Sequence, residues 1–247
     1  MRIPVSLKKN PIIDVTMEFR FNSNLEYELI PGAFWAKIPD EIKNKFRFER
    51  LPIADMPIQI RKMTPNWKII PYFQFVSQDL LISIGIGILS FSNKGEYNDW
   101  ESFWDKIKIF FNAFHQTGIV SSFLRVSLRY VNYIGCDIFK NGTHSISCNN
   151  KLVTSDSESI RYKVREDNNN IVMVSLINDA TITSSFNERF IGKTGSIIDI
   201  DSSREGNFSK DELLNILQSL NNSSKKKFFE SITDELLESF EPEWEKK

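Results

Sequence analysis

The sequence predicts an α+β fold in which curved antiparallel sheets each pack on a long amphipathic helix, in two halves with a similar order of elements. Two observations lead to this prediction. Several segments alternate apolar and polar residues with a period of two, which is typical of strands with one buried face. Two longer segments carry apolar residues at steps of three and four, which is typical of amphipathic helices. Since each kind of element has one apolar face, the two kinds are expected to bury those faces against each other.

Residues 14–21 form the first predicted strand. The apolar side chains on one face are Val15, Met17, Phe19 and Phe21. The polar side chains on the other face are Asp14, Thr16, Glu18 and Arg20. Residues 38–46 predict a weakly amphipathic turn of helix. Short extended runs are then predicted at 58–61, 68–70 and 72–76, because the prolines around them suit strand ends and edge strands.

Residues 80–91 predict a well-buried strand, in which Gly85 and Gly87 mark a bulge or a close approach of another backbone. Residues 100–115 then change to the helical period. The apolar stripe of this predicted helix consists of Phe103, Trp104, Ile107, Phe110, Phe111 and Phe114. Asn98 or Asp99 is expected to cap its start, and Gly118 to follow its end. Such an aromatic stripe indicates a buried helix face rather than a cofactor site.

Residues 125–132 predict the strand that follows this helix. Val126, Leu128 and Tyr130 share one face, and Arg125, Ser127 and Arg129 share the other. An apolar face anchors the strand to the core, so two arginines are displayed together on its polar face.

Residues 137–159 are rich in turn signals and mark the predicted boundary between an N-terminal half, 1–136, and a C-terminal half, 137–247, packed as one unit. In the second half, 160–166, 171–176 and 180–186 predict an antiparallel meander with a hairpin turn at 168–170. Residues 197–201 predict another strand. A long helix is expected after the capping-box pattern at 209–212, and Thr233 is expected to cap a last one.

Composition narrows the class of protein. The 247 residues are 41% hydrophobic and include 20 Phe and 5 Trp, which is enough for a substantial core. The net charge of −1 does not indicate a nucleic-acid partner. Two cysteines, Cys136 and Cys148, and two histidines are too few for a disulfide scaffold, a zinc site or a Ser-His-Asp triad, so no metal or cofactor is predicted. The start of the chain lacks the apolar run of a signal peptide and no stretch is long enough to span a membrane, so we expect a cytoplasmic protein without a membrane partner.

Five short signatures carry a resemblance to a known group of proteins. They are PIIDVTMEFRF at 11–21, Tyr97 with Trp100, RVSLRYVN at 125–132, IIDID at 197–201 and FFESIT at 228–233. With these, the chain resembles a sporadically distributed family of uncharacterised prokaryotic proteins of roughly this length. Where that family often has a histidine in its last helix, this chain has Ser223-Ser224-Lys225. The resemblance implies the fold and a prokaryotic origin, and its patchy occurrence suggests a mobile or defence-linked gene.

The leading candidate binding site comprises Arg125, Arg129, Glu18 and Arg20. If the two strands are neighbours, their polar faces bring guanidinium groups beside a carboxylate, and such a face can bind a carboxylate or a phosphate. The alternative is a ladder of salt bridges across the sheet. Elsewhere, Asp199 and Asp201 share a strand face that is expected to be solvated rather than to bind a metal. The basic run 225–227 is likewise expected to be a solvated face of a helix rather than an anion contact.

Two hypotheses on function remain, and no catalytic residue is assigned. The first is a non-enzymatic cytosolic interaction protein that binds another protein in defence, toxin neutralisation or regulation. It rests on the absence of a recognisable nucleophile or acid–base pair and on abundant aromatic and arginine residues. The alternative is a domain that binds, or acts on, a phosphorylated or nucleotide-like small molecule through the arginine-lined sheet face.

Overall fold

The computed structural model describes residues 3–23, 25, 29–145, 147–148, 151–152, 159–166 and 168–245. The chain forms two units. Unit 1 contains Met1–Val15, Leu128–Ser203 and Gln218–Lys247, and unit 2 contains Thr16–Ser127 and Arg204–Leu217. The predicted boundary after residue 136 therefore falls inside a continuous segment of unit 1. The α+β class and the antiparallel pairing of strands are confirmed.

Unit 1 contains an antiparallel sheet of strands from both ends of the chain. Its order is β10 (Ser159–Arg165), β11 (Ile171–Thr181), β12 (Thr194–Phe208), β7 (Val120–Ile134) and β2 (Ile12–Ser23), of which the last three also contribute residues to unit 2. A short strand near each terminus, β1 (Ser6–Leu7) and β13 (Pro242–Glu243), forms a separate antiparallel pair. Smaller elements are α5 (Ile138–Asn141), β8 (Ser147–Cys148), β9 (Lys151–Leu152) and the 3₁₀ helix η3 (Glu188–Phe190).

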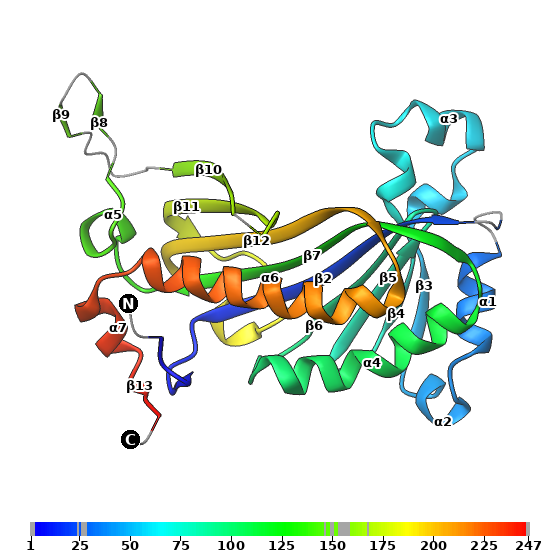
Figure 1. Ribbon diagram of the computed structural model, residues 1–247, viewed down its shortest axis with the longest axis horizontal. Helices are drawn as coiled ribbons and strands as arrows, with labels where there is room; N and C mark the ends of the chain where they lie inside the picture. The colour runs from blue at the N-terminus through cyan, green and yellow to red at the C-terminus, as the bar shows by residue number, and fades with distance from the viewer. Residues whose placement is uncertain are drawn as a thin grey trace. The chain divides into compact units, whose positions relative to one another are not determined.

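The core of unit 1 consists of apolar side chains from its sheet and from α6 (Lys210–Glu230) and α7 (Asp234–Ser239). The ribbons of these elements are drawn in Figure 1. The strand residues of this core include Val172, Val174, Leu176, Ile198 and Ile200, and its helical residues include Phe228, Phe229, Leu236 and Leu237. Thr233 caps α7 by accepting a hydrogen bond from the amide of Leu236, as predicted.

Unit 2 contains residues of β7 and β2 and then β6 (Ile88–Asn93), β5 (Leu80–Gly85), β4 (Pro71–Val76) and β3 (Arg47–Arg50), in that order. The predicted apolar face of β2 is buried, from Val15 to Phe21. Helix α4 (Trp100–Gln116) supplies the other side of this aromatic core: Phe111 stacks on Phe19, and Phe114 meets Phe21 edge-on. Asp99 caps α4 through the amide of Ser102, as predicted.

The other helices of unit 2 are short. They are α1 (Ile30–Ala36), α2 (Asp40–Lys43), α3 (Ile58–Met63) and the 3₁₀ helices η1 (Pro52–Asp55) and η2 (Trp67–Ile69). Two of them overturn predictions of extended chain, at 58–61 and 68–70. At 58–61, the alternation of Ile58 and Ile60 covers too few residues to identify a strand, and Pro57 instead starts a helix by accepting hydrogen bonds from the amides of Ile60 and Arg61.

The single strand predicted at 80–91 is in fact the hairpin β5–β6. Both strands are almost completely buried, so their apolar residues run on without a break that would mark the turn. The expected close backbone approach at the glycines is present. A Cβ on Gly85 would lie 2.3 Å from the carbonyl oxygen of Ile70, and the amide of Gly87 donates to the carbonyl of Lys68.

The meander of unit 1 differs from the prediction in its third strand. Residues 180–186 do not form a new strand, because β11 runs on to Thr181 and irregular chain follows. The register of β11 against β12 shifts between Ile177 and Ala180, and Asp179 has a φ of 51°. This bulge interrupts the alternation of β11, which made its end resemble a separate strand. Among the helices of the described residues, none is long and apolar enough to cross a membrane.

Candidate functional site

Three of the four predicted site residues meet on the polar face of unit 2. Strand β2 presents Glu18 and Arg20, and β7 presents Arg125. The Oε1 atom of Glu18 accepts hydrogen bonds from Nη1 of Arg125 at 2.9 Å and from Nε of Arg20 at 2.8 Å. Arg125 also donates to the hydroxyl of Ser127, at 2.8 Å, and its side chain is only 12% exposed. This arrangement is a cross-strand salt-bridge cluster in which one carboxylate holds two guanidinium groups.

The fourth predicted residue, Arg129, belongs to unit 1 and has a different partner. Its Nε and Nη2 atoms donate to the two carboxylate oxygens of Asp199 on β12, at 2.8 and 2.7 Å. The bonds to Asp199 raise the pKa of Arg129 above its usual value, and the charges of Asp201 and Asp14 act in the same direction. The guanidinium is thus held in a bidentate pair, although its side chain is 54% exposed.

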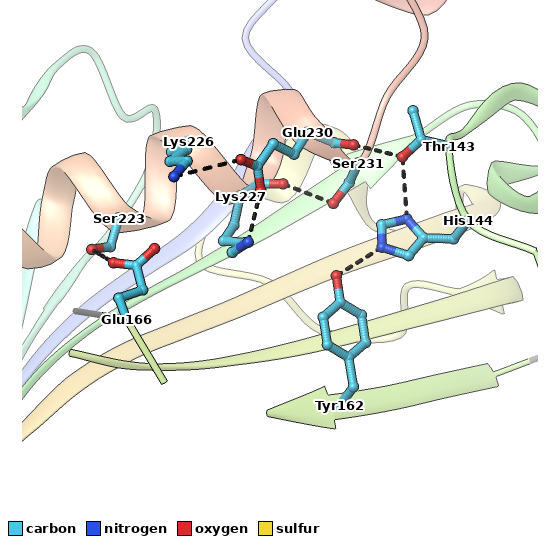
Figure 2. Close-up of polar contacts among 9 residues, drawn as sticks. All are labelled: Thr143, His144, Tyr162, Glu166, Ser223, Lys226, Lys227, Glu230 and Ser231. Atoms are coloured by element: carbon cyan, nitrogen blue, oxygen red, sulfur yellow. Dashed lines mark hydrogen bonds and ion pairs between the residues drawn. The ribbon is translucent and has the colours of Figure 1, made fainter. Parts of the chain in front are cut away.

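A polar cluster that the sequence did not indicate lies at the C-terminal end of α6 (Figure 2). Nε2 of His144 is 2.7 Å from the hydroxyl of Tyr162 on β10, and Nδ1 is 3.4 Å from the hydroxyl of Thr143. That hydroxyl donates at 2.5 Å to the main-chain carbonyl of Glu230. Since the hydrogen of Thr143 is used in this way, the consistent pattern has Nδ1–H donating to Thr143 and Nε2 accepting from Tyr162.

This chain of hydrogen bonds, from Tyr162 through His144 and Thr143 to Glu230, is called here the His144 relay. Burial lowers the pKa of His144, and the positive charge of Lys227 lowers it further. Burial also raises the pKa of Tyr162. Both groups are therefore neutral near pH 7, and the Tyr162 proton is engaged with the imidazole. The relay ends on a main-chain carbonyl rather than a carboxylate, so its evident effect is to tie the 143–144 loop and β10 to α6.

The basic run 225–227 contributes ion pairs on α6. Nζ of Lys227 lies 2.7 Å from the carboxylate of Glu230, and Nζ of Lys226 lies 3.8 Å from it (Figure 2). One turn earlier, the hydroxyl of Ser223 donates to Glu166, just beyond β10. The side-chain amide of Asn170 donates to the same hydroxyl. These contacts join α6 to the β10–β11 hairpin of unit 1.

The remaining candidates do not form a reactive centre within the described residues. No group of three or more His, Cys, Asp or Glu side chains there is arranged to hold a metal ion, and Asp199 is occupied by Arg129. Burial raises the pKa of Cys136 above its usual value, which keeps the thiol protonated and unreactive. The side chain of Cys148 lies outside the described residues.

Unit 2 contains an aromatic groove between α1 and the end of the sheet. Its volume is about 440 Å³. The lining residues, which we call the β3 groove, are Pro31, Gly32 and Trp35 from α1, Phe48 and Arg50 from β3, Ala54 from η1, and Phe73 and Phe75 from β4. Trp35 stacks on Phe75 with ring centroids 4.1 Å apart, and Phe48 stacks on Phe73.

Phe48 sets this groove apart from the aromatic core. Its side chain is 52% exposed, whereas Phe73 and Phe75 beneath it are buried. The chain that follows is also unusual, because Met56, Ile60 and Met63 are exposed. A half-exposed aromatic side chain in a groove is typical of a binding surface, and exposed methionines on the following chain adapt readily to different partners. Sequence reasoning missed the groove, because alternating strand residues do not reveal which of them a helix leaves uncovered.

A scan of protein-family models found no match to the chain, and a search of curated proteins found none either.

Proposed function

We propose that the chain is a non-enzymatic binding protein whose partner is another protein. The observation that carries this proposal is the β3 groove, which has aromatic walls, a half-exposed phenylalanine and a position beside the last strand of the sheet. Aromatic side chains of this kind supply most of the affinity at protein interfaces, since they bury a large area at a small cost in conformational entropy.

The arginines favour this proposal over a phosphorylated or nucleotide-like ligand. Arg125 and Arg129 each bind a carboxylate of the chain itself, Glu18 and Asp199. An anionic ligand on either arginine would have to compete with these carboxylates. Displacing the partly buried Glu18 from Arg125 removes one of its two guanidinium partners, which costs free energy. The arginine face therefore supports a role in stability rather than in ligand binding.

The biological setting is proposed from the resemblance described above. We place the protein in the cytoplasm and give it a role in defence, toxin neutralisation or regulation. A partner protein bound through a groove, without chemistry, suits each of these roles.

The test is affinity capture from the cells that produce the protein, with three baits compared. The wild-type chain is compared with the groove variant Phe48→Ser and with a control, Leu214→Ser, which changes another exposed apolar residue. We expect one stoichiometric protein on the wild type and on the control but not on the groove variant. If the same proteins appear on all three baits, or none appears on any, the groove is not the binding site.

A further inference from the structure

We infer that the β3 groove takes an extended, acidic peptide segment of the partner protein, which adds to β3 as a further strand and places an apolar side chain in the groove. This inference rests on the proposed function and specifies the chemistry of the partner. It depends on the backbone of β3, on the shape of the groove and on the charge of the surrounding chain.

The backbone of β3 is arranged to receive another strand. β3 is the last strand in the order of its sheet and is hydrogen-bonded to β4 in an antiparallel register. The amide of Leu51, next to β3, donates to the carbonyl of Tyr72. Because hydrogen-bonded pairs alternate along an antiparallel ladder, Glu49 bonds to β4, whereas Phe48 and Arg50 direct their N–H and C=O groups away from it. A peptide strand at this edge would pair with those groups, as in other cases of strand addition.

The groove lies on a face of the sheet to which alternate side chains of such a peptide would point. Phe48 and Arg50 point to one face of β3, and both line the groove. Alternate side chains of an added strand point to that same face, so every second residue of the peptide would meet the groove. Its walls, formed by the rings of Trp35, Phe48 and Phe73, suit an aliphatic or aromatic side chain.

The charge of the segment that carries β3 favours an acidic peptide. Residues 37–68, which include Phe48, Arg50 and Ala54, contain eight Lys or Arg and four Asp or Glu, although the whole chain has a net charge of −1. Three of the four acidic residues already have partners within the segment: Asp40 with Lys43, Glu49 with Arg47, and Asp55 with Arg50. A positive excess remains on this segment even without Arg61, which is buried, and it attracts an acidic peptide.

The same charge argues against a second copy of this chain as the occupant. Two β3 edges placed side by side would bring two basic segments together, and like charges at an edge are a common device that prevents edge-to-edge pairing. The partner is therefore expected to be a different molecule.

Gly32 provides a sharp test. It lines the groove from α1, and a Cβ added there would meet nothing within 4 Å. The variant Gly32→Leu therefore brings a side chain into the groove without a clash at its Cβ, and it replaces a glycine inside a helix, which favours folding. Loss of binding in this variant cannot be attributed to loss of the fold if its melting temperature equals or exceeds that of the wild type.

The experiment selects peptides of about ten random residues, displayed on phage, on the wild-type chain, with removal of those that also bind Gly32→Leu. We expect the surviving peptides to be acidic and to alternate apolar with other residues. The best of them, made with a fluorescent label, should lose at least tenfold in affinity on Gly32→Leu and about fivefold on the double variant Lys45→Glu with Arg47→Glu, in line with the loss of charge complementarity. Methylation of the peptide amides that face Phe48 and Arg50 should abolish binding, since strand pairing needs them.

Three results would overturn the inference. Selected peptides without an acidic bias, or with apolar residues at helical spacing, would exclude an acidic strand. Equal recovery of peptides on the wild type and on Gly32→Leu would exclude the groove. A dimer of the wild type that Gly32→Leu dissociates, measured by sedimentation, would identify a second copy as the occupant. The proposed function fails separately, when affinity capture returns no partner that depends on Phe48. A captured partner that requires Phe48 but that acidic peptides do not displace overturns only the inference, because the groove then binds a protein of different chemistry.

Discussion

Arg129 and Asp199 face each other across β7 and β12 and form a bidentate ion pair, with bonds of 2.8 and 2.7 Å. Neither residue was predicted to be the other's partner, although each was considered as a ligand-binding residue from its own strand. The pair shows how this sheet uses its charged face: guanidinium groups neutralise carboxylates on neighbouring strands. It also supplies a direct measure of whether that face contributes to stability.

We expect Arg129 and Asp199 to be coupled by about 0.5–1 kcal/mol, since the geometry is bidentate but the arginine is half exposed. The measurement is a double-mutant cycle of Arg129→Gln and Asp199→Asn by urea denaturation. The coupling should shrink between low and high salt, because an exposed pair is screened. Additive single variants would show that the pair contributes nothing to stability.

Arg125 should contribute more to the stability of the fold than Arg20, although both bind Glu18. The Arg125 side chain is 12% exposed and also donates to Ser127, whereas that of Arg20 is 33% exposed. We expect Arg125→Gln to lower the free energy of unfolding by about 1.5–3 kcal/mol, and Arg20→Gln by less than about 1 kcal/mol. Urea denaturation of the two variants makes the comparison, and equal losses would contradict the difference in burial.

The aromatic stripe of α4 predicts a large loss of stability when one of its buried side chains is replaced by alanine. Phe110 and Phe111 are both 4% exposed, and Phe111 contacts three other aromatic rings. Replacement of either by Ala should cost about 3–5 kcal/mol, because a buried ring leaves a cavity. The neighbouring Ile109 is 37% exposed and serves as the control, with an expected loss below about 1 kcal/mol for Ile109→Ala. An unchanged melting temperature of both phenylalanine variants would contradict the packing of α4.

The spacing of apolar residues within a single helix or strand predicted those elements that bury one face. The alternation in β2 and in β7 and the stripe of α4 were identified correctly, since each element has one apolar side that is buried more completely than the other. The β5–β6 hairpin was missed for the opposite reason. Both of its strands are buried, so no polar residues separated them.

The candidate site depends on which elements are neighbours, and this information is only partly contained in local sequence. The pairing of Glu18 with Arg125 followed from the expectation that their strands adjoin. The pairing of Arg129 with Asp199 needed the position of β12 beside β7, which neither strand's own pattern reveals. His144 lies in a loop and acquires its partners only through the fold, from β10 and from the end of α6.

The His144 relay makes stability depend on pH in the acidic range. Burial and Lys227 hold the pKa of His144 below its ordinary value of 6.5, so the unfolded chain binds a proton more readily than the folded chain. The stability that the neutral imidazole contributes is therefore fully present above about pH 6.5 and is lost as the pH falls through the lowered pKa of the folded state. Protonation would also make Nε2 a donor, and Tyr162 would no longer donate to it.

We expect His144→Gln to lose less free energy of unfolding than the wild type between about pH 7.5 and pH 5, since it removes the group that titrates. Urea denaturation at both pH values provides the measurement. The pKa of His115, on the exposed side of α4, is also lowered, by burial and by Lys210, so His115→Gln is the matched control that separates the two histidines. Tyr162→Phe keeps the imidazole but removes the hydroxyl that donates to it, and should reduce the stability at pH 7.5 by about 1 kcal/mol. If His144→Gln and the wild type lost the same free energy on acidification, the pH dependence would have to arise elsewhere in the chain.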